Sequence, residues 1–199
     1  MDAVNIPHLP QALRWLNQPQ SWDLSATGQL TIIAPGKTDW FIDPQGTVSV
    51  SKAPALLFPV LAPCLLSAQV TVEHLATYDA GVLMVYENPL AWAKLCFELS
   101  PQGTPTIVSV VTKGVSDDCN AFAAKGPMYL RASKLEKAYA FHVSGTGAEW
   151  NLIRYFRLED SASTQMGFLA QSPTGTGCTA SFRDIRFEEK LLTDIRSGE

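Results

Sequence analysis

Three apolar runs follow one another in TYDAGVLMVYENPLAWAKLCFELSPQGTPTIVSVVTK, residues 77–113. The first break between them is Glu87-Asn88-Pro89, and the second is a segment with two prolines and a glycine, residues 100–105. Proline, glycine and asparagine between apolar runs are typical of tight connections. This part of the chain therefore predicts three consecutive strands.

The middle run, residues 91–99, predicts a strand with two unlike faces. Successive side chains of a strand point to opposite faces of its sheet. One face consists of Ala91, Ala93, Leu95, Phe97 and Leu99. The other consists of Trp92, Lys94, Cys96 and Glu98, which place an aromatic ring, an ammonium and a carboxylate in a row. We expect the first face to lie in the core and the second to be the working surface.

Further strand-like runs are spread over the whole chain. They cover residues 29–34, 67–75, 128–133, 137–144, 150–158, 166–171 and 178–187, and the last one loses its alternation near Asp184, where we expect a bulge. Residues 9–22 predict one helical turn, residues 114–122 a polar loop, and residues 188–199 a short helix or a frayed tail. About nine to eleven short strands without a long amphipathic helix predict an all-β antiparallel sandwich or jelly roll.

The most apolar segment is residues 53–66, APALLFPVLAPCLL, which contains three prolines. Proline lacks the N–H group that a central strand needs, so we expect an edge strand or a loop laid across the core. An exposed apolar patch used for dimerisation is the alternative. The 14 residues fall short of the roughly 20 that a membrane-spanning helix needs, so no membrane span is predicted.

Length and composition suit one folded domain over residues 1–199. Hydrophobic residues make up 46 % and charged residues 17 %, which provides enough apolar surface for a core. The net charge of -4 and the lack of a basic cluster argue against a nucleic-acid partner. The N-terminus lacks the pattern of a secretory signal, and the four cysteines form no CxxC pair. We therefore expect free thiols and a cytoplasmic location.

Few residues suggest metal or nucleophilic chemistry. His8, His74 and His142 are far apart and lack a metal-binding motif. Cys96 is expected to be a small buried thiol. The string SPTGTGC, residues 172–178, precedes a strand, whereas a phosphate-binding loop opens a helix. We predict no metal site and no cofactor.

Five motifs occur in an order that resembles a known family. They are RWLNQPQSWDLSATGQLTI (residues 14–32), KTDWF (37–41), DAGVLMVYENPLAWAKLCFELS (79–100), SVVTKGVSDD (109–118) and GFLAQSPTGTGCTASFRDIRF (167–187). Together they resemble a concanavalin A-like family of unknown function that is labelled regulation of enolase. The resemblance covers about residues 13–188 and implies a lectin/glucanase-type jelly roll of two curved antiparallel sheets, standing alone inside the cell. It implies no settled activity.

The concave sheet of a curved sandwich forms a groove, and sugars bind such grooves through aromatic rings surrounded by hydrogen-bonding groups. Trp92, Lys94 and Glu98 share one candidate face. The residues expected to complete its rim are Lys113, Arg131, Trp40 and Asp39. The alternative is that Lys94 and Glu98 form an exposed ion pair of little energetic value and that Trp92 only covers the sheet.

Glycoside hydrolysis is the enzymatic alternative, and it needs two carboxylates placed across the scissile bond. The glucanases that share the implied fold carry the spacing Glu-x-Asp-x-x-Glu on one strand, which this chain lacks. Glu98 and Asp79 are the one pair that we nominate, although Asp79 at a strand start can instead bond the turn backbone. We assign no catalytic residue and favour binding over catalysis.

Three functional hypotheses follow. The first is non-catalytic binding of a carbohydrate or a similar polar ligand in the groove. The second is a regulatory protein that binds another protein, such as a metabolic enzyme, through residues 53–66; a second copy of the chain is a further candidate partner. The third is a glycosidase or lyase with an unfamiliar carboxylate arrangement.

Overall fold

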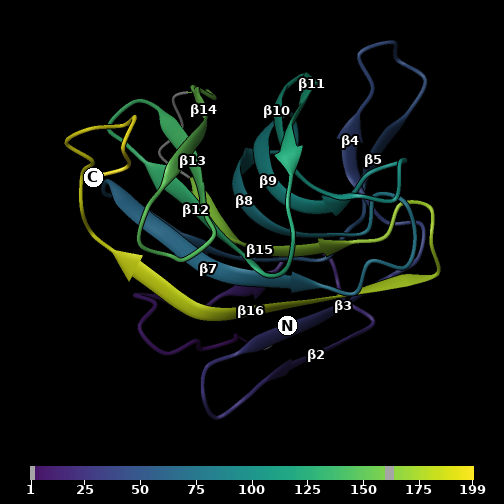
Figure 1. Ribbon diagram of the computed structural model, residues 1–199, viewed down its shortest axis with the longest axis horizontal. Coiled ribbons are helices and arrows are strands. Elements are labelled where there is room, and N and C mark those ends of the chain that lie inside the picture. Colours follow the sequence, from purple (N-terminus) through teal and green to yellow (C-terminus); the bar gives the residue numbers. More distant parts are fainter. Residues whose placement is uncertain (1–2, 160–163) are drawn as a thin grey trace.

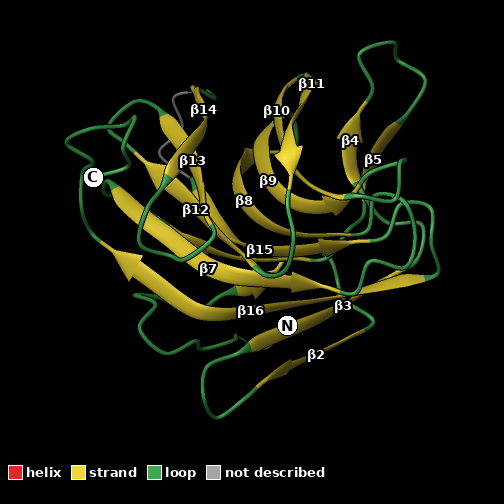
Figure 2. Ribbon diagram, in the orientation of Figure 1, coloured by secondary structure: helices red, strands yellow, loops and turns green. Residues whose placement is uncertain are grey.

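The computed structural model describes residues 3–159 and 164–199. These residues form two seven-stranded antiparallel sheets and one two-stranded hairpin (Figures 1 and 2). The first sheet has the order β1 (Arg14–Trp15), β6 (Ala55–Pro59), β15 (Gln165–Gln171), β8 (Ala80–Asn88), β9 (Ala91–Leu99), β10 (Pro105–Lys113) and β11 (Val115–Ala123). The second has the order β14 (Asn151–Phe156), β13 (Tyr139–Ser144), β12 (Met128–Lys134), β7 (Cys64–Val72), β16 (Gly177–Glu188), β3 (Leu30–Pro35) and β2 (Ser21–Leu24). The hairpin pairs β4 (Trp40–Ile42) with β5 (Ser49–Ser51).

The two large sheets pack face to face and bury a shared apolar core. Strands in which every second residue is apolar contribute side chains to this core. In β3, Leu30, Ile32 and Ala34 are buried, and the residues between them are only half-buried. Phe168 on β15 and Phe182 on β16 meet across the core with ring centroids 5.0 Å apart. The predicted all-β antiparallel sandwich is confirmed, because every sheet pairing among the described residues is antiparallel.

The three strands predicted over residues 77–113 are β8, β9 and β10, and they are neighbours in the first sheet. The face of β9 with Ala93, Leu95 and Phe97 lies in the core between the sheets, as predicted. The chain then continues directly into β11, so the prediction of a polar loop over residues 114–122 is wrong. Pairing with β10 gives this polar segment its strand conformation, because its own side chains are mostly exposed.

Residues 53–66 do not form one central strand, as their prolines predicted. They contribute β6 and the start of β7. The expected edge strand or loop is wrong, because β6 lies between β1 and β15 and β7 lies between β12 and β16. The side chains of Ala55, Leu56, Leu57 and Phe58 are buried, and Leu61 is the exposed large apolar residue of the segment. The prediction of an exposed apolar patch is therefore wrong, because most side chains of this segment are buried in the fold.

Three local predictions concern chain ends and bulges. The bulge near Asp184 is confirmed, because the β16–β7 register shifts between Arg183 and Arg186 and Asp184 has a φ of 49°. The helical turn predicted in residues 9–22 is wrong, because this segment contributes β1 and β2. The C-terminal helix is also wrong: Gly198 N donates to Asp194 O at 2.9 Å and closes a turn. No helix in the part of the chain that the structure describes is long and apolar enough to cross a membrane.

Candidate functional site

A cavity of about 230 Å³ opens on the outer face of the first sheet, the face turned away from the core. Strands β8–β10 curve toward β4 on this side of the sandwich (Figure 1). The residues that line the cavity are Asp39, Phe41, Tyr78, Lys94, Glu98, Val110, Asp118 and Gln171. They come from the β4–β5 hairpin and its approach, the loop before β8, and strands β9, β10, β11 and β15. The face that carries Lys94 and Glu98 thus borders this cavity.

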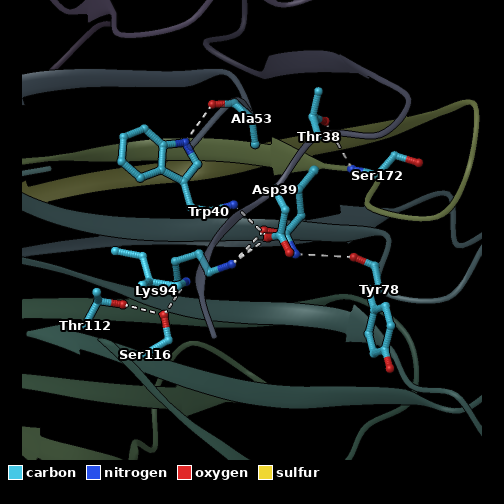
Figure 3. Close-up of polar contacts among 11 residues, drawn as sticks. Thr38, Asp39, Trp40, Ala53, Tyr78, Lys94, Thr112, Ser116 and Ser172 are labelled. Atoms are coloured by element: carbon cyan, nitrogen blue, oxygen red, sulfur yellow. Dashed lines mark hydrogen bonds and ion pairs between the residues drawn. The ribbon is translucent and has the colours of Figure 1, made fainter. Parts of the chain in front are cut away.

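The β4–β5 hairpin forms one wall of this cavity because it is fixed to the sheet. The Trp40 ring makes edge contacts with Trp92 and Tyr86, with centroids 5.7 and 5.8 Å apart. Trp40 Nε1 donates to Ala53 O at 2.9 Å, and the backbone N of Ile42 donates to Ser116 Oγ on β11 at 3.0 Å. These contacts hold Asp39, which precedes β4, against the sheet (Figure 3).

Lys94 is the central cation of the site, and its side chain is only 3 % exposed. Its Nζ donates to Asp39 Oδ1 at 3.0 Å and to Gln171 Oε1 at 2.9 Å (Figure 3). Burial disfavours the charged form of Lys94, but the nearby acidic groups, Asp39 first, outweigh burial and raise its pKa. Lys94 is therefore charged at neutral pH, and two of its three N–H donors already have acceptors in the protein.

The partners of Lys94 are themselves held in place. Asp39 Oδ1 also accepts from the backbone N of Trp40 at 2.7 Å. Gln171 Nε2 donates to Tyr78 O at 3.4 Å. Tyr78 has a φ of 71°, in the left-handed region that costs a non-glycine residue roughly 1–2 kcal/mol, and its side chain remains 39 % exposed. This backbone conformation places Tyr78 at the edge of the cavity, which it lines.

Two more carboxyl groups border the cavity. Glu98 lies on β9, and Asp118 on β11 is directly opposite Val110, which is directly opposite Lys94. Burial, with Asp118 and Asp39 adding to it and Lys94 opposing it, raises the pKa of Glu98 to about 8. Partial desolvation likewise raises the pKa of Asp118. Glu98 is therefore a neutral acid at pH 7 and offers the cavity both a donor and an acceptor.

Of the seven residues predicted for the site, Asp39, Lys94 and Glu98 come together at the cavity. Trp40 supports the site from behind, through its contact with Trp92. The prediction that Trp92 offers its ring to a ligand is wrong, because the β4–β5 hairpin covers it and leaves it 0 % exposed. The exposed Lys94–Glu98 pair is also wrong, because Lys94 is buried and pairs with Asp39.

Lys113 and Arg131 do not join the site. Lys113 is directly opposite Ala91, so it belongs to the core-facing side of β10 and is exposed beyond the core at the strand end. Arg131 lies on β12 in the second sheet, between the core residues Leu130 and Ala132, and therefore points to the outer face of that sheet. Both predictions are wrong because strand pairing, which decides the face, is set by loop lengths and long-range contacts.

Asp79 takes the structural role. Its side chain is fully buried and accepts from the backbone N of Leu75 and Ala76 at 3.1 and 2.8 Å and from Ser172 Oγ at 2.7 Å. Glu98 and Asp79 therefore do not form a pair across a ligand site. The carboxyl group that shares the cavity with Glu98 is Asp118, which the sequence reasoning missed along with Phe41, Tyr78 and Gln171. Reading residues 115–123 as a strand would have placed Asp118 on the face of Lys94.

The cysteines among the described residues show no sign of reactive thiol chemistry. Cys64, Cys96, Cys119 and Cys178 are free, as predicted, and Cys119 is the exposed one. Burial raises the pKa of the Cys96 thiol, against the influence of Lys94, so Cys96 stays protonated. Within residues 3–159 and 164–199, no group of three or more His, Cys, Asp or Glu side chains could hold a metal ion.

Several solved structures share this fold. A functionally unknown protein from Saccharomyces cerevisiae is 23 % identical, with a TM-score of 0.84, over 90 % of this chain and 97 % of that one. The GH43 protein BlXynB from Bacillus licheniformis is 17 % identical, with a TM-score of 0.65, over 87 % of this chain and 36 % of that one. The carbohydrate binding module CBM66 from Bacillus subtilis is 10 % identical, with a TM-score of 0.51, over 87 % and 94 %. At these identities the likenesses establish the jelly-roll fold alone.

No curated protein matches this sequence. The link to regulation of enolase stays a prediction, because none of these three proteins is described as acting on enolase. One family model matches residues 15–190, which is most of the chain, and its description is a protein of unknown function, DUF1349. The chain belongs to this family, DUF1349.

Proposed function

We propose that this protein binds a saccharide, or a similar small ligand rich in hydroxyl groups, in the cavity between the β4–β5 hairpin and the first sheet, without catalysing a reaction. One observation carries the proposal: a cavity lined by a buried ammonium, three carboxyl groups, one amide and two aromatic rings. Sugar sites combine hydrogen-bonding groups that fix the hydroxyls with a ring that contacts the apolar face of the sugar.

The size and surface of the cavity support a small ligand. Its volume of about 230 Å³ is below the roughly 300–1,000 Å³ of sites for drug-sized ligands, so it suits a single sugar ring. Tyr78 and Phe41 replace Trp92 as the aromatic contact surface. The likeness in fold to a carbohydrate binding module is consistent with this use of the sandwich.

The hydrogen-bonding groups complement vicinal hydroxyls. Lys94 has one N–H donor left after Asp39 and Gln171, and a ligand oxygen can accept from it. Glu98 and Asp118 provide acceptors for the hydroxyl protons. A hydrolase would need two carboxyl groups placed across the scissile bond. In this proposal Glu98 and Asp118 bind hydroxyl groups instead. The chain also spans only about a third of the GH43 protein, so activity of that longer protein is not carried over.

Ligand-induced stabilisation tests the proposal. A sugar at 100 times its dissociation constant stabilises the native state by about 2.7 kcal/mol, which raises the Tm by about 5–10 °C for a chain of this length. We expect one or more neutral monosaccharides to give this shift, and Tyr78→Ala to weaken it at least tenfold in apparent affinity. Tyr155→Ala is the matched control, because Tyr155 is also exposed, at 57 %, but lies on β14 of the other sheet.

Two results would contradict the proposal. One is the absence of a shift with any monosaccharide. The other is a shift that Tyr78→Ala and Tyr155→Ala reduce equally, because binding would then not involve this cavity.

A further inference from the structure

The charges around the cavity do not balance. Asp39, Glu98 and Asp118 are three carboxyl groups, and Lys94 is the one cationic residue that lines the cavity. Lys94 forms its ion pair with Asp39, at 3.0 Å. Within the described ranges, 3–159 and 164–199, no ion pair involves Glu98 or Asp118. Neither acid therefore has a cation at ion-pair distance. Lys94 acts on both from farther away, and Arg154, which pairs with Asp117, also acts on Asp118.

The Lys94 ammonium is fixed in place and does not form an ion pair with Glu98 or Asp118. Its side chain is 3 % exposed, and Asp39 and Gln171 fix its ammonium at 3.0 and 2.9 Å. Its third N–H has no acceptor among the residues that the structure describes, although it belongs to a buried group at the cavity wall. Buried donors without an acceptor are rare in native proteins and call for a partner. The wall thus offers one donor for a ligand oxygen beside two acids that lack a cation at ion-pair distance.

An organic ammonium suits these two acids better than a metal ion does. A metal ion would need several protein ligands converging on one point, and the described residues contain no group of three or more His, Cys, Asp or Glu side chains with that geometry. An ammonium group needs only one or two carboxylate acceptors and brings its own three donors. The space of about 230 Å³ leaves room for a ring that carries it.

We propose that the ligand is an amino sugar: its ammonium group lies between Glu98 and Asp118, and its neighbouring hydroxyl oxygen accepts the free N–H of Lys94. This inference rests on the proposed function and names the class of saccharide. A sugar with an amino group next to a hydroxyl presents this combination on adjacent ring carbons. Sugar acids and sugar phosphates would place a negative charge against the same two carboxyl groups and are disfavoured.

The electrostatics of Glu98 support this assignment. Burial and the neighbouring Asp118 and Asp39 raise its pKa to about 8, so the empty cavity holds it as a neutral acid. An ammonium beside it favours the ionised form and lowers this pKa. Binding of an amino sugar is therefore linked to release of a proton from Glu98, whereas binding of a neutral sugar is not.

Titration calorimetry on the full chain tests the inference. Glucosamine, galactosamine and mannosamine are each compared with their parent sugar, their N-acetyl derivative and, for the glucose series, glucuronate, at one pH near 7 and low salt. We expect at least one amino sugar to bind tenfold or more tightly than its parent and its N-acetyl derivative, and glucuronate to bind most weakly. The parent sugar carries a hydroxyl of nearly the same size in place of the ammonium, so this comparison isolates the effect of the charge. The N-acetyl derivative also lacks the charge but carries a larger substituent, and it tests in addition whether the cavity of about 230 Å³ admits it.

Substitutions locate the effect. Glu98→Gln keeps the hydrogen-bonding shape and removes the acid, so we expect the ratio of amino-sugar affinity to parent-sugar affinity to fall to threefold or less. Asp118→Asn, at an exposed position, is the second variant and decides the question if Glu98→Gln does not fold. Glu73→Gln, an exposed acid away from the cavity, is the matched control.

The outcomes separate this inference from the proposed function. If parent sugars bind as tightly as amino sugars, or if glucuronate binds best, the inference is wrong and the proposed function stands. If no sugar of either kind binds, the proposed function fails and the inference fails with it. If the preference persists in both Glu98→Gln and Asp118→Asn, the ammonium lies elsewhere and the inference is wrong.

Discussion

Lys94 and Arg131 are two buried cations on opposite outer faces of the sandwich, 2 % and 6 % exposed. Lys94 has a carboxylate partner, with Asp39 Oδ1 3.0 Å from its Nζ. Arg131 has none within ion-pair distance among the described residues; its guanidinium lies 4.2 Å from the centre of the Trp150 ring and donates to Gly198 O at 2.6 Å. Each buried cation is thus stabilised by different groups: Lys94 by a carboxylate, and Arg131 by an aromatic ring and a backbone carbonyl.

The difference separates a candidate site from a structural contact. Acidic neighbours raise the pKa of Lys94 despite its burial, whereas burial lowers the pKa of Arg131 to about 10. Beside Lys94 the fold leaves about 230 Å³ open, and beside Arg131 it leaves about 50 Å³, because the C-terminal turn at Gly198 covers the guanidinium. A buried cation alone therefore does not mark a ligand site; the open volume beside it does.

The largest loss of stability is expected when Asp39, the carboxylate partner of Lys94, is removed. Asp39→Ala leaves the Lys94 ammonium buried with only the Gln171 amide as an acceptor, and breaking a buried pair in this way costs about 3 kcal/mol. Chemical denaturation measures the loss. The double variant Asp39→Ala, Lys94→Met removes the stranded charge and should recover at least half of it; a double variant as unstable as Asp39→Ala would show that the pair's charge is not what the fold depends on.

A smaller effect, and one that depends on pH, is expected at Glu98. Its pKa is raised from 4.5 to about 8 in the folded state, so the folded protein holds the proton more tightly than the unfolded chain. The stabilisation is complete below about pH 4.5 and is lost as the pH rises toward 8. Between pH 5 and pH 8 this amounts to about 2 kcal/mol, about half the full linkage value because the carboxyl keeps some contact with solvent.

Denaturation curves at pH 5, 6.5 and 8 test this linkage. Glu98→Gln cannot ionise, so its stability relative to the parent protein should increase by about this amount from pH 5 to pH 8. The lowered pKa values of His74 and His142 affect both proteins alike and cancel in this difference. Glu73→Gln, exposed on the surface, should follow the parent protein. Parallel pH profiles for the parent and Glu98→Gln would mean that Glu98 ionises as easily in the folded protein as in the unfolded chain.

The second cation should be far easier to replace than the first. Arg131→Met keeps the stem against Trp150 and removes a buried charge without stranding a carboxylate. The lost hydrogen bond to Gly198 O is offset by the desolvation that the charge no longer suffers, so we expect a loss of about 1 kcal/mol in the same denaturation experiment. A loss equal to that of Asp39→Ala would show that Arg131 is paired as strongly as Lys94.

The fold could be predicted from local pattern, and part of the site with it. Alternation and turn residues placed β8, β9 and β10, and the parity of β9 placed Lys94 and Glu98 together. Asp118 was missed because β11 has almost no buried side chains, so its strand conformation depends on pairing with β10 and leaves no apolar alternation in the sequence.

Long-range contacts account for the other misses. Trp92 looks exposed from its own strand, and only the β4–β5 hairpin, some fifty residues earlier in the chain, buries it under Trp40. Lys113 and Arg131 carry the right chemistry, but the face on which each lies follows from the register of its strand pairing. The sequence pattern of a strand predicts which residues share a face, but it does not predict which other segment of the chain covers that face.

The smallest effect is expected at a second ion pair that is slightly shorter than the first. Arg154 Nη2 lies 2.8 Å from Asp117 Oδ2, but the Asp117 side chain is 71 % exposed, against 23 % for Asp39. Water already solvates the Asp117 carboxylate, so Asp117→Asn should cost less than about 0.5 kcal/mol, and still less in 0.5 M salt, where such pairs are screened. Denaturation of Asp117→Asn beside Asp39→Ala measures both pairs in one protein. A cost above about 2 kcal/mol would mean that contact distance, and not burial, sets the energy of these ion pairs. Burial would then not explain why the Lys94–Asp39 pair matters to the fold.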